Sequence, residues 1–193
     1  MEEKSKILNL EEAKIYWSLR AKEQGIKYVG HIGHSNEEHK NFYWRKAKFL
    51  NELIPRHKRV LDFGCGVGMF SHLFDKGKYL GVDIIDSAIN LTLPHYRYQL
   101  IENYSEIEGR FDLIFTANVL QHISDLGDVF KCFRKVMRKG HLLLMENYTD
   151  SGVHMYPRGG VEYCNIIENY FHIKSLKTEM FEGGNLAMKI KVK

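Results

Sequence analysis

Three glycines at alternating positions follow a short apolar run, and this feature constrains the fold more than any other in the chain. Residues 60–63 read Val-Leu-Asp-Phe, and Gly64, Gly66 and Gly68 come directly after them. A short apolar run that ends at glycine is typical of a buried strand. Glycine lets the backbone turn tightly and approach a ligand where a side chain would collide. We therefore predict a strand that ends in a ligand-binding turn.

The chain after residue 57 alternates between short apolar strands and amphipathic helices. The expected strands are residues 60–63, 78–82, 97–101, 111–115 and 141–145. One expected helix follows the glycines and carries Met69, Phe70, Leu73 and Phe74; another spans residues 126–137 and ends before Gly140. This alternation favours a parallel sheet with right-handed crossovers, and so an α/β fold.

The last residues depart from that rhythm. Apolar and lysine residues alternate over 186–193, and Glu182-Gly183-Gly184-Asn185 before them has turn chemistry. The pattern predicts a C-terminal β-hairpin, which places an antiparallel strand in the sheet.

Polar residues stand at the ends of four expected strands. Gly64 ends the first, Asp83 the second, Glu102 the third and Thr116 the fourth. Open α/β sheets bind their ligands at the carboxyl ends of parallel strands. The four positions therefore point to one binding edge.

Two motifs resemble a known family. The pattern from Asp62 to Gly68, D-x-G-C-G-x-G, resembles motif I of the class I S-adenosylmethionine-dependent methyltransferases, and residues 111–122 resemble the fourth-strand region of that family. The resemblance covers residues 58 to about 147. It implies a Rossmann-like, mostly parallel sheet of seven strands in the order 3-2-1-4-5-7-6, with helices on both faces and an antiparallel C-terminal strand.

The resemblance also implies S-adenosylmethionine as cofactor and S-adenosylhomocysteine as product. Asp83 would accept the ribose hydroxyls, Ile84 would pack against adenine, and Glu102 or Asn103 would contact the adenine amine. Backbone oxygens at 116–118 would meet the amino group of the cofactor. The full expected set is Asp62, Gly64, Cys65, Gly66, Gly68, Met69, Phe70, Asp83, Ile84, Glu102, Asn103, Thr116, Ala117 and Asn118.

Methyl transfer is an in-line displacement, so the main task of the protein is to position the acceptor. A base is needed only where the acceptor must lose a proton. His122 is the candidate, because an imidazole with a pKa near 6.5 suits that task; packing beneath the helix that follows is the alternative. The expected acceptor contacts are His34, Tyr43, Glu146, Asn147, His154, Tyr156 and Arg158.

Residues 1–57 precede the core at 58–193 and show two capped helices. Asn9 with Glu12, and Ser35 with Glu38, have the spacing of capping boxes. Aromatic residues on these helices must pack against the sheet domain. We expect a lid on the acceptor side of the pocket; the alternative is a cover for the flank of the sheet.

Composition limits the cellular setting. The chain has 193 residues and a net charge of +4, and its apolar stretches are far shorter than the roughly 20 residues of a membrane span. The charged start has no apolar signal core. Three scattered cysteines have no metal-ligand spacing and suggest free thiols in a reducing compartment. We expect a cytoplasmic protein with no metal and no membrane partner.

Parts of the sequence are compatible with other functions. A nicotinamide dehydrogenase is disfavoured by Asp62, the glycine spacing and the C-terminal hairpin. A regulatory module that binds S-adenosylmethionine without catalysis would keep the same motifs. An RNA- or protein-directed methyltransferase remains an alternative, but the Asn/Asp-Pro-Pro-Tyr/Phe tetrad is missing, so a small-molecule acceptor is preferred. Residues 31–34 spell the HIGH signature of nucleotidylyl transferases, yet they precede the first strand rather than following it.

Overall fold

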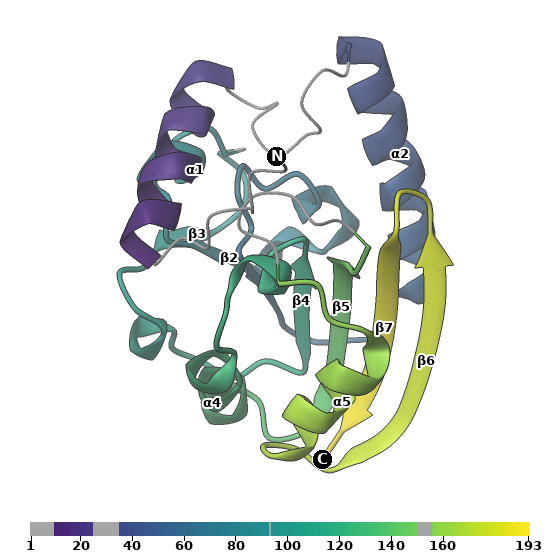
Figure 1. Ribbon diagram of the computed structural model, residues 1–193. Helices are drawn as coiled ribbons and strands as arrows, with labels where there is room; N and C mark the ends of the chain where they lie inside the picture. The colour runs from purple at the N-terminus through teal and green to yellow at the C-terminus, as the bar shows by residue number, and fades with distance from the viewer. Residues whose placement is uncertain (1–9, 25–34, 93, 150–155) are drawn as a thin grey trace, which may run out of the picture.

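The computed structural model describes residues 10–24, 35–92, 94–149 and 156–193. Seven strands form a single sheet in the order β3-β2-β1-β4-β5-β7-β6, which confirms the predicted order (Figure 1). The strands are β1 (Val60–Phe63), β2 (Tyr79–Asp83), β3 (Tyr98–Leu100), β4 (Leu113–Ala117), β5 (Gly140–Asn147), β6 (Ile173–Phe181) and β7 (Asn185–Val192).

Strands β1 to β5 pair in parallel, and β7 runs antiparallel to its two neighbours. β1 lies between β2 and β4, with Val60 opposite Tyr79 on one side and opposite Leu113 on the other. β7 runs antiparallel to both β5 and β6, from Asn147 opposite Asn185 to Gly140 opposite Val192 along β5. The predicted C-terminal hairpin is therefore present, and its second strand lies between β5 and β6.

Helices cover the two faces of the sheet. On one face, α4 (Gly127–Val136) and α5 (Gly160–Glu168) bury Phe130, Phe133 and Tyr163 against the sheet. On the other face, α2 (Asn36–Leu53) buries Leu50 and Leu53 in a second apolar cluster. Alternate residues of each strand point to opposite faces, so buried strands supply both clusters.

α2 belongs to the packing of the sheet itself. Its capping box is present as predicted: the Ser35 hydroxyl accepts from the Glu38 amide, and the Glu38 carboxylate accepts from the Ser35 amide at 2.8 Å. Leu50 and Leu53 share one apolar cluster with Val60, Phe115 and Leu143 of the sheet. This helix therefore packs on one face of the sheet.

α1 (Leu10–Gln24) lies elsewhere, over the turn that follows β1. Ala21 is buried with Val67 of that turn and with Ala88 of α3 (Asp86–Ile89). The Ser87 hydroxyl donates to the backbone oxygen of Ser18 at 3.3 Å. Asn9, the expected cap of this helix, lies outside the described residues. Among the helices described, none is long and apolar enough to cross a membrane.

The prediction of an α-helix directly after the glycines is wrong. Turns and one short 3-10 helix, Ser71–Leu73, occupy that segment. Phe70 and Phe74 instead point into the sheet face beneath α2, where both rings lie within 6 Å of the Phe115 ring. Their apolar spacing reflects this packing and not a helical face.

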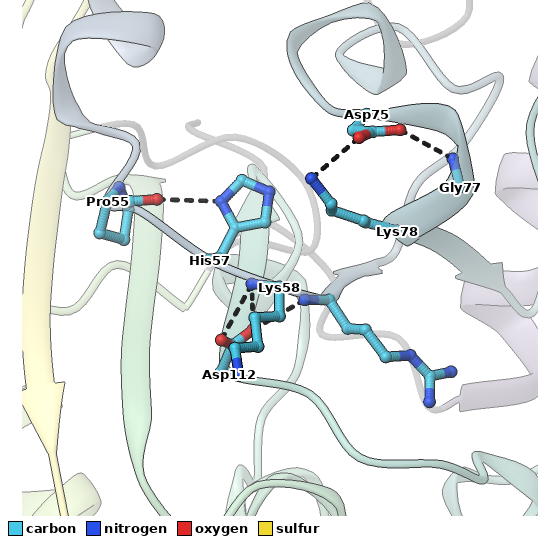
Figure 2. Close-up of polar contacts among 8 residues, drawn as sticks. Pro55, His57, Lys58, Asp75, Gly77, Lys78 and Asp112 are labelled. Carbon is cyan, nitrogen blue, oxygen red and sulfur yellow. Dashed lines mark hydrogen bonds and ion pairs between the residues drawn. The ribbon is translucent and has the colours of Figure 1, made fainter.

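The amino edge of the sheet, at the opposite end from the glycine turn, is closed by one carboxylate. Asp112 precedes β4 and accepts hydrogen bonds from the backbone amides of Lys58 and Arg59 at 2.8–3.0 Å (Figure 2). Nearby, Asp75 accepts from the Gly77 amide and pairs with Lys78 at 2.9 Å. Asp112 thus fixes the start of β1 against the start of β4.

Candidate functional site

The glycine turn after β1 has the backbone that its sequence predicts. Gly64, Gly66 and Gly68 have φ values of 70°, 54° and 72°, in the left-handed region that favours glycine. The amides of Gly64 and Cys65 both donate to the backbone oxygen of Val82, at 2.9 and 3.0 Å. The turn is therefore tied to β2 as it leaves β1.

Neighbouring side chains leave no room for a larger residue in this turn. A β-carbon at Gly64 would lie 2.5 Å from the methyl groups of Val119, and one at Gly68 would collide with the Tyr98 hydroxyl. Backbone conformation and close packing both demand glycine here. A cradle of this kind exposes backbone amides in place of side chains.

Asp83 ends β2 and joins two backbone segments. Its carboxylate accepts from the amide of Gly66 at 2.7 Å and from that of Ile85 at 2.9 Å. Burial raises the pKa of this carboxyl, and the backbone hydrogen bonds oppose that change. A carboxylate has about four lone-pair sites, so Asp83 can still accept a hydrogen bond from a ligand.

Asp62, two residues before the first glycine, is held beneath the turn. Its carboxylate accepts from the Tyr79 hydroxyl at 2.6 Å and is 3% exposed. Burial raises the pKa of Asp62 to about 7, against the lowering effect of the Tyr79 hydrogen bond. The structure places Asp62 behind the cradle, where it supports β1 against β2.

The other residues expected around the cofactor divide into two groups. Met69 and Ile84 are half-buried beside the contact between α1 and the glycine turn, and Ala117 is half-buried at the end of β4. Cys65 and Phe70 are buried, and Phe70 packs beneath α2. The Phe70 ring is part of the apolar core. Its contact with a cofactor stays a prediction.

Glu102 and Asn103 follow β3 and are exposed. Asn103 caps the 3-10 helix Tyr104–Glu106: its side chain accepts from the Ser105 amide at 3.1 Å, and Glu106 bonds back to its amide. The Glu102 amide also donates to Glu106. The side chain of Asn103 thus shapes its own turn, which leaves Glu102 as the better placed of the two for a ligand.

The turn after β4 is built around a buried carboxylate from β5. Glu146 accepts from the amides of Val119 and Gln121 at 2.9 and 3.3 Å, and from the Thr116 hydroxyl at 3.2 Å. Burial raises the pKa of Glu146 to about 7, while the backbone hydrogen bonds and Lys46 oppose the rise. Thr116 and Glu146 therefore hold the backbone at the carboxyl edge.

Two further residues expected at the acceptor also bond to backbone groups. The guanidinium of Arg158 donates to the oxygens of Leu120, Ile123 and Ser124 at 2.6–3.1 Å. Asn147 donates to the oxygen of Gly183 at 2.8 Å. Glu146, Asn147 and Arg158 thus have hydrogen-bond partners within the fold, and their contact with an acceptor stays a prediction.

His122, Tyr43 and Tyr156 remain as acceptor candidates among the described residues. His122 ends the 3-10 helix Leu120–His122, and its ring packs edge-on against Trp17 of α1 with centroids 5.0 Å apart. The Tyr43 ring lies 4.6 Å from the His39 ring, and burial raises its pKa. The Tyr156 hydroxyl is buried and has no hydrogen-bond partner in the described part of the chain. His34 and His154 lie outside the described residues.

Lys46 belongs to this edge and was not predicted. It lies on α2 and is 1% exposed. Its ammonium donates to the side-chain oxygen of Asn118 and, at 3.5 Å, to that of Asn185. The sequence of α2 does indicate that Lys46 is buried. It falls on the same helical stripe as His39, Leu50 and Leu53, all of which are buried.

Comparison with known proteins agrees with this geometry. The profile of a family described as a methyltransferase domain matches residues 36–186, from the start of α2 to β7. A ubiquinone biosynthesis O-methyltransferase of Coxiella burnetii is 28% identical over 131 residues, which are 61% of this chain and 56% of that protein. A malonyl-[acyl-carrier protein] O-methyltransferase of Legionella pneumophila is 27% identical over 136 residues, 58% of this chain and 48% of that one. The chain spans about half the length of these curated relatives.

Solved structures share the fold at low sequence identity. The magnesium protoporphyrin IX methyltransferase of Synechocystis PCC 6803, crystallised with S-adenosylhomocysteine, superposes with a TM-score of 0.72 at 14% identity and covers 96% of this chain and 100% of that one. A Haloferax volcanii methyltransferase in complex with the Trm112 activator gives 0.68 at 12% identity, covering 92% and 96%.

Proposed function

The chain belongs to a family of methyltransferase domains, and from that membership we propose that it transfers the methyl group of S-adenosylmethionine to an oxygen of a small-molecule acceptor. The observation that carries the proposal is the turn of three left-handed glycines beside Asp83, at the carboxyl edge of the sheet. The Rossmann-like fold of class I S-adenosylmethionine-dependent methyltransferases surrounds it.

The residues at this edge fit the cofactor. The three glycines leave this turn without side chains, which suits a ligand that lies against the backbone. Asp83 would hold the ribose hydroxyls with the lone pairs that Gly66 and Ile85 leave unused. Ile84 and Met69, both half-buried, supply apolar surface for the adenine, and the backbone of residues 116–118 forms the opposite wall.

The chemistry asks for positioning more than for acid or base. S-adenosylmethionine supplies a methyl group on a sulfonium, which is already activated for displacement. The protein must then hold the acceptor oxygen in line with that methyl group, which contributes roughly 7–11 kcal/mol to lowering a barrier of this kind. An acceptor hydroxyl must also lose its proton, and His122 is the base that we propose, because an imidazole exchanges protons near neutral pH.

Two observations support a small acceptor with a polar group. The curated relatives are named as O-methyltransferases, one of ubiquinone biosynthesis and one of a malonyl-[acyl-carrier protein]. The Tyr156 hydroxyl is buried without a partner among the described residues, and a buried hydroxyl of this kind is satisfied when a ligand supplies an acceptor or donor.

The free thiols of Cys65, Cys132 and Cys164 fit the cytoplasmic location that we propose.

α1 is the part of the 1–57 segment that we propose as a cover. It packs Ala21 on Val67 of the glycine turn and Trp17 on His122. Its contacts therefore lie on the cofactor turn as well as on the acceptor side. Loss of this helix should weaken cofactor binding together with turnover.

Isothermal titration with S-adenosylhomocysteine tests the cofactor assignment. We expect one molecule bound per chain and no heat with NAD. Asp83→Ala should weaken this binding. Asp86→Ala serves as its matched control, since Asp86 is an exposed carboxylate three residues along the same segment. Binding of NAD with none of S-adenosylhomocysteine would end the methyltransferase proposal. Transfer of labelled methyl to hydroxyl- and carboxyl-bearing small molecules, but not to their O-methylated forms, would establish oxygen as the acceptor atom.

A further inference from the structure

Lys46 is a buried ammonium in a position where the helix would accept an apolar residue. It lies between the rings of Phe42 and Phe70, with its Nζ 6.0 and 5.8 Å from their centroids. Burying a charge in such surroundings is unfavourable unless hydrogen bonds compensate for the lost water. The compensation comes from two side-chain amides, those of Asn118 and Asn185. A methionine would fill the same space, so packing does not explain a lysine at this position. Its hydrogen bonds to Asn118 and Asn185 do.

Asn118 needs those hydrogen bonds because its backbone has an unfavourable conformation. Its φ of 58° is left-handed, and it is the sole residue other than glycine with a positive φ in the described ranges. The conformation costs a residue with a β-carbon free energy unless its surroundings hold it. Its side-chain oxygen accepts from Lys46, and its side-chain nitrogen donates to Gln121 at 3.2 Å and to Asn185 at 3.0 Å.

The backbone at Asn118 forms a wall of the glycine cradle. Its amide donates to the backbone oxygen of Met145 at 2.7 Å, and Val119 comes next in the chain. The methyl groups of Val119 fill the space directly against Gly64. A change of backbone conformation at Asn118 therefore moves the side chain that shapes the first glycine of the turn.

We infer that Lys46 is a positioning residue for the methyl-transfer site: by bonding the Asn118 side chain it keeps the turn after β4 in the left-handed conformation that sets Val119 against the glycine cradle. The inference rests on the proposed function, since it assigns Lys46 to the cofactor pocket proposed above. Lys46 acts through Asn118 and is not placed in contact with the reacting atoms.

The electrostatics of the site agree with this role. Burial lowers the pKa of Lys46 to about 8, and the Glu146 carboxylate opposes that change. The ammonium is therefore mostly protonated at neutral pH, and its hydrogen bond to Asn118 is charge-assisted.

Lys46→Met is the first test, with Lys48→Met as the matched control from an exposed position of α2. S-adenosylhomocysteine affinity is measured by titration, and folding by the melting transition. We expect Lys46→Met to fold and to bind about tenfold more weakly, since a tenfold change corresponds to 1.4 kcal/mol, within the range that a left-handed residue costs. Lys48→Met should bind as the wild type does. Wild-type affinity in Lys46→Met would overturn the inference, whereas wild-type protein that binds no S-adenosylhomocysteine would overturn the proposed function instead.

A glycine at position 118 separates this role from any other role of Lys46. Glycine adopts the left-handed conformation without help, so Lys46→Met should lose less than twofold in affinity when it is added to Asn118→Gly. An undiminished loss in that background would overturn the inference. Should Lys46→Met fail to fold, Asn118→Ala and Asn118→Gly are compared directly. We expect the glycine variant to bind more tightly by about tenfold, and equal affinities would contradict the role assigned to Lys46.

Discussion

The amide of Gly66 donates a 2.7 Å hydrogen bond to the carboxylate of Asp83, so one buried side chain joins the glycine turn to the end of β2. The same carboxylate accepts from the amide of Ile85. Asp83 is therefore both the expected ribose ligand and a support for the turn on which the rest of the cofactor would lie. Removal of this side chain should affect binding and folding together.

Asp83→Ala should weaken S-adenosylhomocysteine binding by about tenfold to a hundredfold, as expected for a lost charge-assisted contact worth roughly 1.5–3 kcal/mol. It should also lower the free energy of unfolding by about 1–3 kcal/mol, because the buried Gly66 amide loses its acceptor. Titration calorimetry and urea denaturation measure the two effects. Unchanged affinity would mean that the ribose is held elsewhere.

Gly68→Ala should destabilise the turn for two separable reasons. Its φ of 72° is unfavourable for alanine, and the added methyl group would collide with the Tyr98 hydroxyl. Tyr98→Phe removes the hydroxyl, but it keeps the two ring carbons that would lie 2.8 and 2.9 Å from the added methyl group, and it keeps the backbone cost. The double variant should therefore recover part of the stability lost by Gly68→Ala and keep a residual loss of about 1 kcal/mol in urea denaturation. Full recovery would show that the backbone conformation at residue 68 costs nothing.

Asp62 should make the protein less stable as the pH rises from about 4 to 7. Burial raises the pKa of Asp62 to about 7 from the ordinary 3.8, so the folded state binds a proton over that range which the unfolded state has released. The stabilisation is complete below about pH 4 and is lost as the pH passes through 7. Glu146, with a pKa raised to about 7, acts in the same direction.

Asp62→Asn should therefore flatten the fall in unfolding free energy between pH 5 and pH 7.5, by an amount on the order of 2 kcal/mol. Asparagine can still accept from the Tyr79 hydroxyl, so the fold is retained. Chemical denaturation at the two pH values measures the difference. The same slope in the variant and the wild type would show that Asp62 does not take up a proton on folding.

Arg158→Met should destabilise the turn after β4 without removing any group proposed to touch the cofactor. Three backbone oxygens, of Leu120, Ile123 and Ser124, would lose their donor. We expect a loss of about 2–4 kcal/mol in the free energy of unfolding and a small change in S-adenosylhomocysteine affinity. Turnover should fall more than affinity, because His122 lies on this turn. An affinity loss as large as that of Asp83→Ala would instead place Arg158 at the cofactor.

Features with a local backbone cause could be predicted from the sequence. The alternating glycines imply left-handed positions, and all three have them. Ser35 with Glu38 implied a capping box, which is present. The strand order followed from the family resemblance and is confirmed.

Features that depend on tertiary contacts with other elements were harder to predict from the sequence. The spacing of Phe70 and Phe74 suggested a helix, but their rings fill the sheet face that such a helix would cover. α5 was not predicted, although Tyr163 and Ile167 in it have helical spacing. The backbone hydrogen bonds of Glu146 and Arg158 could not be predicted, because their partners lie on other elements of the edge.

The sheet also has an order of assembly built into it. β7 is the last of the seven strands to be synthesised, yet it lies between β5 and β6, and Asn185 at its start completes the amide partners of Lys46. While the chain emerges from the ribosome, the open edge of β5 remains unpaired until the final hairpin is available to dock. The binding edge is therefore completed only after β7 has been synthesised, and a chain stalled before residue 185 would carry the glycine turn without the buried lysine network beside it.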